Sequence, residues 1–564
     1  YTFQELMSAG MALIIFGLPA ACIGSVLPLM IRAISQKSPA LGSSVGTLLT
    51  WNTLGAVVGT LFTGFVLMPM VGVRNGFATL ALVLALAAML FAGRQRWRPG
   101  MAASVIAGAF AAVLFVWGGQ DWRYVIDAGA FRSQEREFDP QLMSLRKKLV
   151  EIVYYEDGPD ATIAIEQDRT SHPIRGLRVN GKVDASNGQD LSTQFLVSHL
   201  PMFARPGAKD VFIFGLGSGI SAGALTSYPL ERITVAENCE PVIRASQFFT
   251  NWNHNVLLDP RVHLWREDAR TVLKLDPQLY DVIIAQPSNP WTAGIGSVFS
   301  REFYEISASR LKPGGIMTQW FHVYEMHDGI VELVLRTFGS VFPFVEIWDT
   351  GSGDIVLLGS MQPWPSNPDV FRQSFAIPGV KSDMATIGIQ SPEALWARQM
   401  ASQRTAFAIA GEGPIQSDLF PVLEYAAPRA FYIGITATAL NSFDERTRQM
   451  QLASANKLAT LRSLPRQEIL PIFQRFSTVN LEFFDSLTGR GAGADVPCVF
   501  NTNAPPATGD GLNQAVAALN SGDLKQAAQL TTEVLRQNQT NLVAAYLNRI
   551  IDREQQLQGL NGKP

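Results

Sequence analysis

The feature that most constrains this chain is a set of four long stretches without a charged residue within its first 120 positions. They lie between Glu5 and Arg32, between Lys37 and Arg74, between Arg74 and Arg94, and between Arg98 and Asp121. Each is long enough for a membrane span, because about 20 apolar residues cross the hydrocarbon core of a bilayer. A core helix rarely stays uncharged for so long, and a signal peptide has only one short apolar segment. We therefore predict four transmembrane helices in residues 1–120.

These predicted helices carry small residues at the spacing that lets helices pack closely in lipid. Gly55, Gly59 and Thr63 recur at every fourth position, and Gly64 follows them. No Asp, Glu, Lys or Arg lies inside a stretch, and Asn52 is expected to form a hydrogen bond between helices. Because ion and proton pathways need ionisable groups, we expect these helices to anchor the protein and not to transport a solute.

The charges that flank the stretches predict an orientation. Five basic residues lie on one side, namely Arg32, Lys37, Arg94, Arg96 and Arg98, and Arg74 alone lies on the other. The side rich in Lys and Arg tends to be cytoplasmic, so everything after residue 120 is expected on the periplasmic or external face. The chain begins at Tyr1 and not at Met, which leaves processing and further helices upstream of it open.

Composition limits the remaining classes of function. The 564 residues are too many for one core, so three or four structural units are expected. The formal net charge is −3, and nucleic-acid binding would need a basic face, so no nucleic-acid partner is expected. Three cysteines (Cys22, Cys239, Cys498) and six scattered histidines predict neither a disulfide framework nor a metal site. A Cys239–Cys498 bridge is open in principle, but two separate buried thiols are favoured.

A glycine-rich loop at residues 215–219 predicts a nucleoside-binding site. The apolar strand DVFIFG precedes GLGSG (Gly215, Gly217, Gly219), a helical stretch follows, and the next strand, RITVAE, ends at Glu237. Glycines let the backbone approach a ligand at a helix N-terminus, and an acid at the next strand end can hold the ribose hydroxyls. The loop, helix and acid stand in the required order, which a chance glycine turn does not provide.

Further strands alternate with helices after this loop. RVHLWRED contains Asp268, where adenine is often recognised, YDVIIAQPSNPW opens into a loop at Gln286, and LKPGGIMTQWF follows a Pro-Gly-Gly turn. This alternation predicts a Rossmann-like parallel sheet over residues 201–360, with ligands at the carboxyl ends of its strands. Residues 121–200 are expected to form a membrane-proximal helix and a small β unit. An α/β domain without a ligand stays an open alternative.

Several motifs resemble the spermidine synthase superfamily, namely VNGKVDASNGQDLSTQFLVSHLPM, GLGSG, AQPSNPWTAGIGSVFSREFY and LKPGGIMTQWFHVY. The stretches GTLLTWNTLGAVVGTLFTGFVLMPMVG and SDLFPVLEYAAPR resemble its membrane-fused bacterial branch, and the resemblance covers most of residues 10–430. It implies an S-adenosylmethionine-methyltransferase-type fold, a multi-pass protein of the bacterial inner membrane, and aminopropyl transfer to a polyamine. The donor would be decarboxylated S-adenosylmethionine or S-adenosylmethionine, without a metal. The implied ligand-binding residues are Gly215, Gly217, Ser218, Gly219, Glu237, Asp268 and Gln194.

The residues that this chemistry needs are changed in this chain. An alkyl amine with a pKa of about 10 must lose its proton, and in the family the first Asp of a D-S-S-D-P-type loop accepts it, helped by the Tyr of a Y-Q-E stretch. By resemblance, Gln286 stands at the base position and Asn289 at the second acid. Thr193, Gln194 and Phe195 replace the Y-Q-E stretch, and Ser218 replaces an Asp of the glycine loop. A neutral amide does not accept a proton at neutral pH, so loss of aminopropyl transfer is favoured over its retention.

Other acids in the same motifs are candidates to approach the pocket, namely Asp184, Asp190, Glu325 and Asp418. None of them fills the base position by resemblance. We therefore take Gln286, Thr193 and Asp190 as the catalytic positions. Glu240 is an alternative to Glu237 as the ribose ligand, because the local match slips by one residue.

The rest of the chain carries less information. Residues 361–485 are expected to form an accessory region, and residues 486–511 a linker rich in Gly, Pro, Ala and Asn. Residues 512–564 predict a helical hairpin that resembles a tetratricopeptide unit through its small residues Ala518, Gly522, Ala527 and Ala528. One such unit is fewer than the three needed to stand alone. A hairpin docked on the α/β domain and a partner-binding hairpin are both open.

The sequence thus favours a membrane-anchored, spermidine synthase-like protein with an adenosyl-nucleoside pocket. The alternative is a catalytically inactive scaffold or accessory subunit of a membrane complex, which would contact partners through the C-terminal helices. A homo-oligomer is also open. An open pocket lined by acids would favour the enzyme, and a pocket plugged by Phe195 and Trp291 would favour the scaffold.

Overall fold

The computed structural model describes residues 2–36, 41–117, 121–129, 140–351, 353–365, 367–438 and 510–561, together with 440, 443–445, 452 and 457. The chain divides into two compact units, and each is described by itself. The first contains Tyr1–Gln120 and Asp157–Asp160, and the second contains Asp121–Glu156 and Ala161–Pro564. Of the predicted linker, residues 486–509 lie outside the described residues, as does Cys498.

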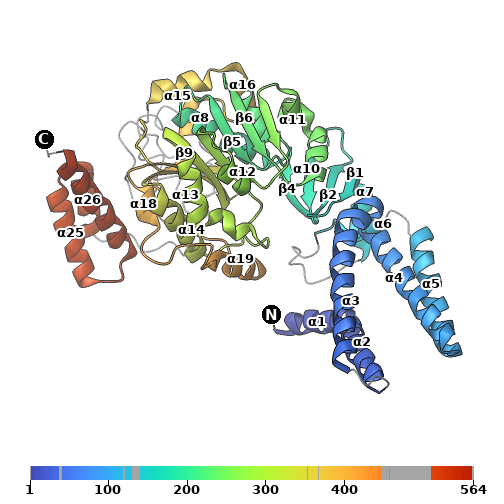
Figure 1. Ribbon diagram of the computed structural model, residues 1–564. Coiled ribbons are helices and arrows are strands. Elements are labelled where there is room, and N and C mark those ends of the chain that lie inside the picture. Colours follow the sequence, from blue (N-terminus) through green and yellow to red (C-terminus); the bar gives the residue numbers. More distant parts are fainter. Residues whose placement is uncertain are drawn as a thin grey trace. The chain divides into compact units, whose positions relative to one another are not determined.

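The first unit consists of apolar helices (Figure 1). They are α1 (Thr2–Ala12), a π-helical turn (Leu13–Gly17), α2 (Leu18–Ser35), α3 (Leu41–Phe62), a second π-helical turn (Thr63–Leu67), α4 (Met68–Arg94) and α5 (Arg98–Trp117). By length and composition, two helical stretches can cross a membrane, residues 9–35 and 42–94, and the apolar helix 98–113 is shorter. The second stretch is interrupted at Gly72, where φ is 78° and ψ is 168°. The uncharged segments are helical where the structure describes them, but two stretches and not four meet the length of a membrane span, so the four transmembrane helices stay a prediction.

Small residues do bring two of these helices together, but not the ones predicted. A Cβ atom added to Gly108 of α5 would lie 3.6 Å from the Cβ of Ala85 of α4, so the two backbones approach closely. No atom lies within 4 Å of the same position at Gly55 or Gly59. The small-residue contact of this unit is therefore between α4 and α5, because their sequences place Ala and Gly on the facing sides.

The second unit begins with a small antiparallel sheet. Two helices, α6 (Asp121–Ile126) and α7 (Pro140–Leu149), precede strands β1 (Val150–Asp157), β2 (Thr162–Asp168), β3 (Arg175–Val179) and β4 (Lys182–Ser186). The strands pair in sequence order. Asn180 and Gly181 both have positive φ (51° and 82°), as a two-residue hairpin turn between β3 and β4 requires. Four strands therefore lie in the segment where a small β unit is expected.

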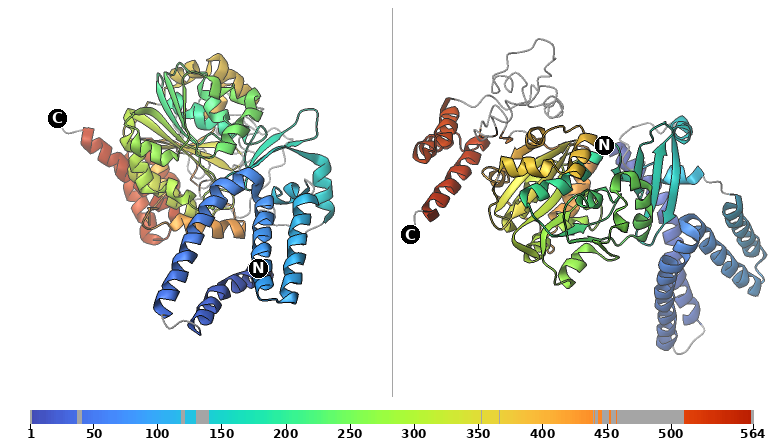
Figure 2. Two further views of the ribbon diagram at one scale, coloured as in Figure 1. Left: turned by 45° about the vertical axis from the view of Figure 1, so that its right-hand side comes forward. Right: turned by 90° about the horizontal axis from the view of Figure 1, so that it is seen from above.

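The main sheet has eight strands in the order β12-β10-β11-β9-β8-β5-β6-β7. Figure 1 and Figure 2 show this sheet among the helices of the unit. Its strands are β5 (Asp210–Phe214), β6 (Arg232–Ala236), β7 (Val262–Trp265), β8 (Tyr280–Ala285), β9 (Leu311–His322), β10 (Phe344–Gly351), β11 (Asp354–Ser360) and β12 (Gln399–Ala401). The five strands from β5 to β9 run parallel, and β10, β11 and β12 pair antiparallel.

The prediction of a purely parallel sheet is therefore wrong at one edge. After β9 the chain returns to the sheet as the hairpin β10–β11, and a hairpin can only be antiparallel. Glycines at 351 and 353 adopt positive φ in its turn. The fold is that of a Rossmann-like, methyltransferase-type domain with a mixed sheet.

Helices cover both faces of this sheet. Alternate strand residues, such as Val211 and Phe212, enter two separate hydrophobic cores. The helices that pack into one core are α8 (Leu191–Ala204), α9 (Ile220–Leu225), α10 (Glu240–Ala245), α15 (Pro368–Phe375), α16 (Pro378–Thr386) and α17 (Pro392–Trp396). The 3₁₀ turns Ser246–Phe249 and Val256–Leu258 also contribute to it, and α11 (Thr250–Asn253) contacts α9. The other receives α12 (Ala269–Leu275), a 3₁₀ turn Ile295–Phe299, α13 (Arg301–Ser309), α14 (Asp328–Val341), α18 (Ala406–Ile409) and α19 (Val422–Ile433).

Three C-terminal helices complete the second core, α24 (Asp510–Asn520), α25 (Leu524–Gln537) and α26 (Leu542–Asn561). The Arg549 guanidinium donates to the Ala408 carbonyl (Nε to O, 2.9 Å), and Arg404 forms an ion pair with Glu554. The helices are therefore docked on the α/β unit, which is one of the two expectations. Their likeness to a tetratricopeptide unit stays a prediction.

One glycine in the sheet provides a test of this packing. A Cβ atom at Gly359 of β11 would lie 2.5 Å from Phe338 Cε1 and 2.9 Å from Phe342 Cβ. We expect Gly359→Ala to lower the free energy of unfolding by about 1–3 kcal/mol, the usual cost of overpacking. Gly339 in α14 has no atom within 4 Å, so Gly339→Ala should raise it by about 0.5–1 kcal/mol. Urea unfolding of the detergent-purified chain measures both, and equal effects would contradict the packing described.

Candidate functional site

The candidate site lies at the carboxyl ends of β5, β6 and β8, where the glycine loop follows β5. Gly215, Gly217 and Gly219 have φ values of 83°, 55° and 79°, which side chains other than glycine rarely adopt. The loop is joined to the next strand because Gly215 N donates to Ala236 O (2.9 Å). The predicted loop is thus present between a parallel strand and a helix.

Glu237 is held directly beside this loop. Its Oε2 accepts from the backbone N–H of Leu216 (3.0 Å), and its Oε1 accepts from that of Cys239 (2.8 Å). The side chain is buried, and burial raises the pKa of Glu237 above its usual range, although the backbone N–H groups oppose this shift. The backbone N–H groups of Gly217 and Asn238 also act on this carboxylate, so the loop and the end of β6 together hold it in place.

The alternative ribose ligand, Glu240, is placed differently. Its carboxylate pairs with Arg244 (3.1 Å) and with Arg266 (3.1 Å) on the surface of the unit. Asp268 caps α12, since its Oδ1 accepts from the Thr271 N–H (2.8 Å). The geometry favours Glu237 over Glu240 at the loop, and the adenine contact of Asp268 stays a prediction.

Neutral side chains join α8 to the glycine loop. The Ser218 hydroxyl donates to Gln194 Oε1, while Gln194 Nε2 donates to Ser186 O (2.7 Å). Asn253 Nδ2 donates to the Ser218 carbonyl (2.9 Å). Of the residues matching Y-Q-E, Gln194 therefore meets Ser218, which matches the loop Asp, and it does so through neutral hydrogen bonds.

Gln286 follows β8 at the same edge of the sheet. Its Oε1 accepts from the Ser221 hydroxyl (2.7 Å), so its amide contacts the start of α9. Asn289 is buried, and its Nδ2 lies 3.5 Å from the Tyr324 hydroxyl. The two positions that match the acids of the family thus have neutral partners among these described contacts.

An acid that the sequence analysis missed lies next to Thr193. The Thr193 hydroxyl donates to Asp354 Oδ2 (2.8 Å) and lies 3.0 Å from the Thr350 hydroxyl. Asp354, at the start of β11, is 6 % exposed, and burial, with a contribution from nearby Asp190, raises its pKa to about 7. A carboxyl group with a pKa near neutrality is suited to accept or donate a proton. No motif marks Asp354, because it meets α8 only through the β10–β11 hairpin.

The four acids singled out in the sequence fall into different places. Asp184 accepts from Ser288 (2.8 Å) and pairs with Lys182, and Asp190 accepts from Ser186 (2.8 Å). These contacts place both beside the site. Asp418 instead pairs with Arg270, and Glu325 lies in a turn with a φ of 54°.

The two predicted plugging residues have other environments. Phe195 is buried in the core beneath α8, and its ring lies 6.2 Å from that of His199. Trp291 packs against His322 (ring centroids 4.9 Å apart) and Phe431 (4.8 Å). Cys239 is a buried free thiol. Within the described residues, no group of three His, Cys, Asp or Glu side chains could hold a metal ion.

Known proteins resemble this part of the chain. The spermine/spermidine synthase domain matches residues 191–348. Polyamine aminopropyltransferase 2 of Pseudomonas aeruginosa is 30% identical over 172 residues, which are 30% of this chain and 49% of the relative. The polyamine aminopropyltransferase of Corynebacterium efficiens is 28% identical over 309 residues, 52% of this chain and 56% of the relative.

A solved spermidine synthase from Thermotoga maritima has 19% identity and a TM-score of 0.34, covering 42% of this chain and 88% of its own. The chain spans about half the length of the two curated relatives above.

The pKa of Asp354 predicts how stability depends on pH. Between the usual pKa of 3.8 and about 7, the native state keeps a proton that the unfolded chain has lost, so stability falls as pH rises through this window. Asp354→Asn keeps an acceptor for Thr193 but removes the buried charge. We expect it to raise the free energy of unfolding at about pH 8 by about 1–3 kcal/mol and to flatten its pH dependence in this window.

Chemical unfolding across this pH range measures the effect. Asp259→Asn is the matched control, because a hydrogen bond from Arg261 lowers the pKa of Asp259. Asp259→Asn should therefore lower the free energy of unfolding at neutral pH, which is the opposite of the effect expected for Asp354→Asn. A loss of stability in Asp354→Asn at pH 8 would contradict the buried-acid assignment.

Proposed function

Since the chain belongs to the spermidine synthase-like family, we propose that it binds an adenosyl sulfonium compound at the glycine loop and transfers a group from it. The family uses decarboxylated S-adenosylmethionine, so aminopropyl transfer to a polyamine is the default reaction. The observation that carries the proposal is the Glu237 carboxylate, which the Leu216 and Cys239 N–H groups hold beside the glycine loop. Such a carboxylate can accept both hydroxyls of a ribose.

The proposed reaction is a displacement at carbon. The lone pair of an unprotonated amine attacks the methylene group next to the sulfonium, the C–S bond breaks, and its electron pair stays on sulfur as a neutral thioether. The new ammonium then loses one proton. Gln286 cannot take it, because an amide is not a base at neutral pH. We propose that Asp354, which accepts a hydrogen bond from Thr193 at the edge of the site, receives this proton.

We also propose that the apolar helices of the first unit anchor the protein in a bacterial inner membrane, with the second unit on the periplasmic or external face. Support comes from the two stretches at 9–35 and 42–94 and from the excess of Lys and Arg in the first and third loops. Release of the chain from membranes by alkaline carbonate would contradict the anchor.

A second candidate function is a catalytically inactive accessory subunit that binds the nucleoside without turnover. It is favoured by the neutral groups at the two positions that match the acids of the family, Gln286 and Asn289. In that case the docked C-terminal helices and the exposed loops would contact partner subunits or a second copy of the chain.

Nucleoside binding is the first test. We expect calorimetric titration of the detergent-purified chain with decarboxylated S-adenosylmethionine or methylthioadenosine to show saturable binding. Glu237→Gln should weaken it about tenfold or more, since a hydrogen bond to a charged acceptor contributes about 1.5–3 kcal/mol. Binding should also weaken at acidic pH, because protonation of Glu237, whose pKa is raised, removes the charged acceptor.

Glu240→Gln is the matched control for this test. Glu240 is a nearby acid that pairs with Arg244 and Arg266, so its loss should leave nucleoside affinity unchanged. Equal effects of the two substitutions, or no binding by the unaltered chain, would refute the proposed ligand site.

Turnover separates the enzyme from the accessory subunit. With 1,4-diaminobutane as acceptor, release of methylthioadenosine by the unaltered chain supports the enzyme, and Asp354→Asn should lower its rate about 100-fold, as for loss of a general base. If only Gln286→Asp gains activity, the unaltered chain is the inactive member. Unchanged turnover in Asp354→Asn would remove Asp354 from the reaction.

A further inference from the structure

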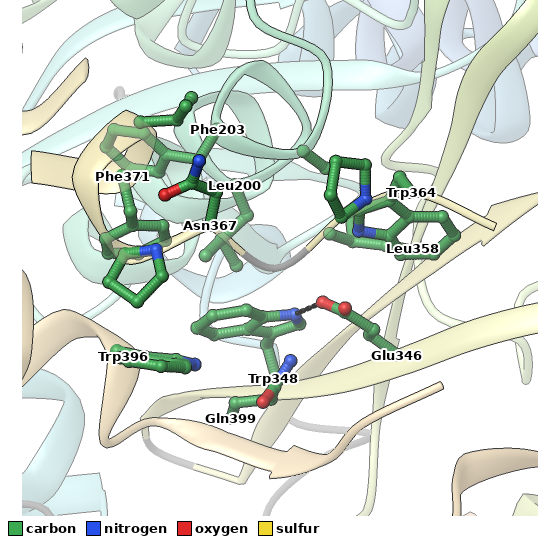
Figure 3. A pocket seen from close by; sticks show the side chains of 14 residues that line it. Leu200, Phe203, Glu346, Trp348, Leu358, Trp364, Asn367, Phe371, Trp396 and Gln399 are labelled. Carbon is green, nitrogen blue, oxygen red and sulfur yellow. Dashed lines mark hydrogen bonds between the residues drawn. The ribbon is translucent and has the colours of Figure 1, made fainter. Parts of the chain in front are cut away.

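A small aromatic cavity lies in the second unit, beneath the last turn of α8 and against β10, β12 and α15 (Figure 3). Its walls include three indole rings, two phenyl rings and one carboxylate, from Trp348, Trp364, Trp396, Phe203, Phe371 and Glu346. Its internal space is about 40 Å³. Since about 10–15 Å³ of such space holds one water molecule, the cavity has room for roughly three atoms of that size.

Four of the five rings form one connected group around Phe371. The Phe371 centroid lies 4.6 Å from that of Phe203, 6.3 Å from that of Trp348 and 6.5 Å from that of Trp396. The Phe371 and Trp348 planes differ by only 8°. The faces of aromatic rings are electron-rich, and indole attracts a cation most strongly. The walls of the cavity therefore favour a positive charge.

Glu346 adds a formal negative charge to this wall. The side chain is 2 % exposed, its Oε2 accepts from Trp348 Nε1 (3.0 Å), and its Oε1 accepts from Gln403 Nε2 (3.2 Å). Figure 3 shows the carboxylate directed at the Trp348 indole. Both donors are neutral, and none of the ion pairs among the described residues includes Glu346. Burial raises the pKa of Glu346.

The cation whose field acts on Glu346 is already engaged elsewhere. Lys457 lowers the pKa of Glu346 through its field, but its Nζ lies 3.3 Å from Glu445 Oε2 and donates to the Gln399 carbonyl (2.7 Å). Lys457 and Glu445 thus balance one another. A buried carboxylate without a counter-charge is costly, so a cation entering the cavity would be stabilised by Glu346 and by the rings together.

We propose that this cavity binds the ammonium end of an unbranched primary alkylamine. The ammonium N–H groups donate to Glu346, and the first methylene groups lie against the indole and phenyl rings. A primary ammonium fits better than a quaternary one, because Glu346 offers a hydrogen-bond acceptor and the space is small. The inference goes beyond the proposed function and is independent of it, because none of these residues contacts the glycine loop in the contacts described above.

Amine binding at Glu346 should depend on pH. If free Glu346 holds a proton, entry of an ammonium expels it, so affinity should rise with pH until Glu346 is ionised in the free protein. The charged groups on the elements packed around Glu346 include two pairs, Lys457 with Glu445, and Arg398 with Asp349 (3.9 Å) on the neighbouring parts of β12 and β10. On α15 and α17, Arg372 pairs with both Asp369 and Glu393, so none of these groups leaves an unbalanced positive charge for Glu346.

The test uses calorimetric titration of the full chain in detergent with n-butylamine as the probe and n-butanol as its neutral analogue. We expect saturable binding of the amine, no comparable binding of the alcohol, and an amine affinity that rises as the pH increases above 4.5, the usual pKa of a Glu carboxyl. Glu346→Gln should weaken amine binding at least tenfold and abolish this pH dependence. Trp364→Leu, at a less buried wall of the cavity, should also weaken amine binding. It provides the test if Glu346→Gln fails to fold.

Glu237→Gln is the matched control, since it alters the nucleoside site and should leave amine affinity unchanged. Equal binding of butanol and butylamine, or amine binding that survives both Glu346→Gln and Trp364→Leu, would overturn the proposal. Amine binding that is lost only in Glu237→Gln would place the amine at the nucleoside site and overturn it as well. A failure of nucleoside binding with amine binding intact would leave this proposal standing and refute only the proposed function.

Discussion

Ser218 connects the parts of the candidate site, and their arrangement depends on it. Its hydroxyl donates a hydrogen bond to Gln194 of α8 and accepts one from the Ile220 N–H at the start of α9. Its carbonyl accepts a hydrogen bond from Asn253 of α11. The residue stands in a loop whose glycines leave the backbone few steric limits. Ser218 therefore joins the loop to three helices, in addition to the hydrogen bonds that Gly215 makes to Ala236 and Leu216 to Glu237. Its neutral hydroxyl also means that this connection does not change with pH.

Much of the central architecture could be predicted from the sequence, because it follows from local patterns. Apolar strands such as DVFIF, alternating with helices, predict parallel β5 to β8, and Glu237 is found by its spacing from Gly217. In each case the signal lies within one short segment of the chain, so local chemistry is enough.

The features that were missed depend on contacts between distant residues. Thr193 and Asp354 are 161 positions apart, and they meet because the β10–β11 hairpin adds antiparallel strands beside β9. Nothing in the residues around Asp354 marks a catalytic motif. In the same way, Trp348, Trp364 and Trp396 read as ordinary core residues until the sheet edge and α15 bring them around Glu346. The antiparallel edge thus supplies both buried acids, and both face α8.

The docking of α26 has a consequence for how the chain is made. Tyr546, Leu547 and Ile550 are fully buried in the same hydrophobic core as Phe212 of the central strand β5. Ribosomes add residues in order, at about 5–20 per second. Roughly half a minute therefore passes between the synthesis of β5 and the synthesis of α26, which completes this part of the core. During that interval the nascent α/β unit exposes apolar surface, which makes it prone to aggregate. We therefore expect its folding to finish only after translation of α26, and a chaperone that shields this face to be needed until then.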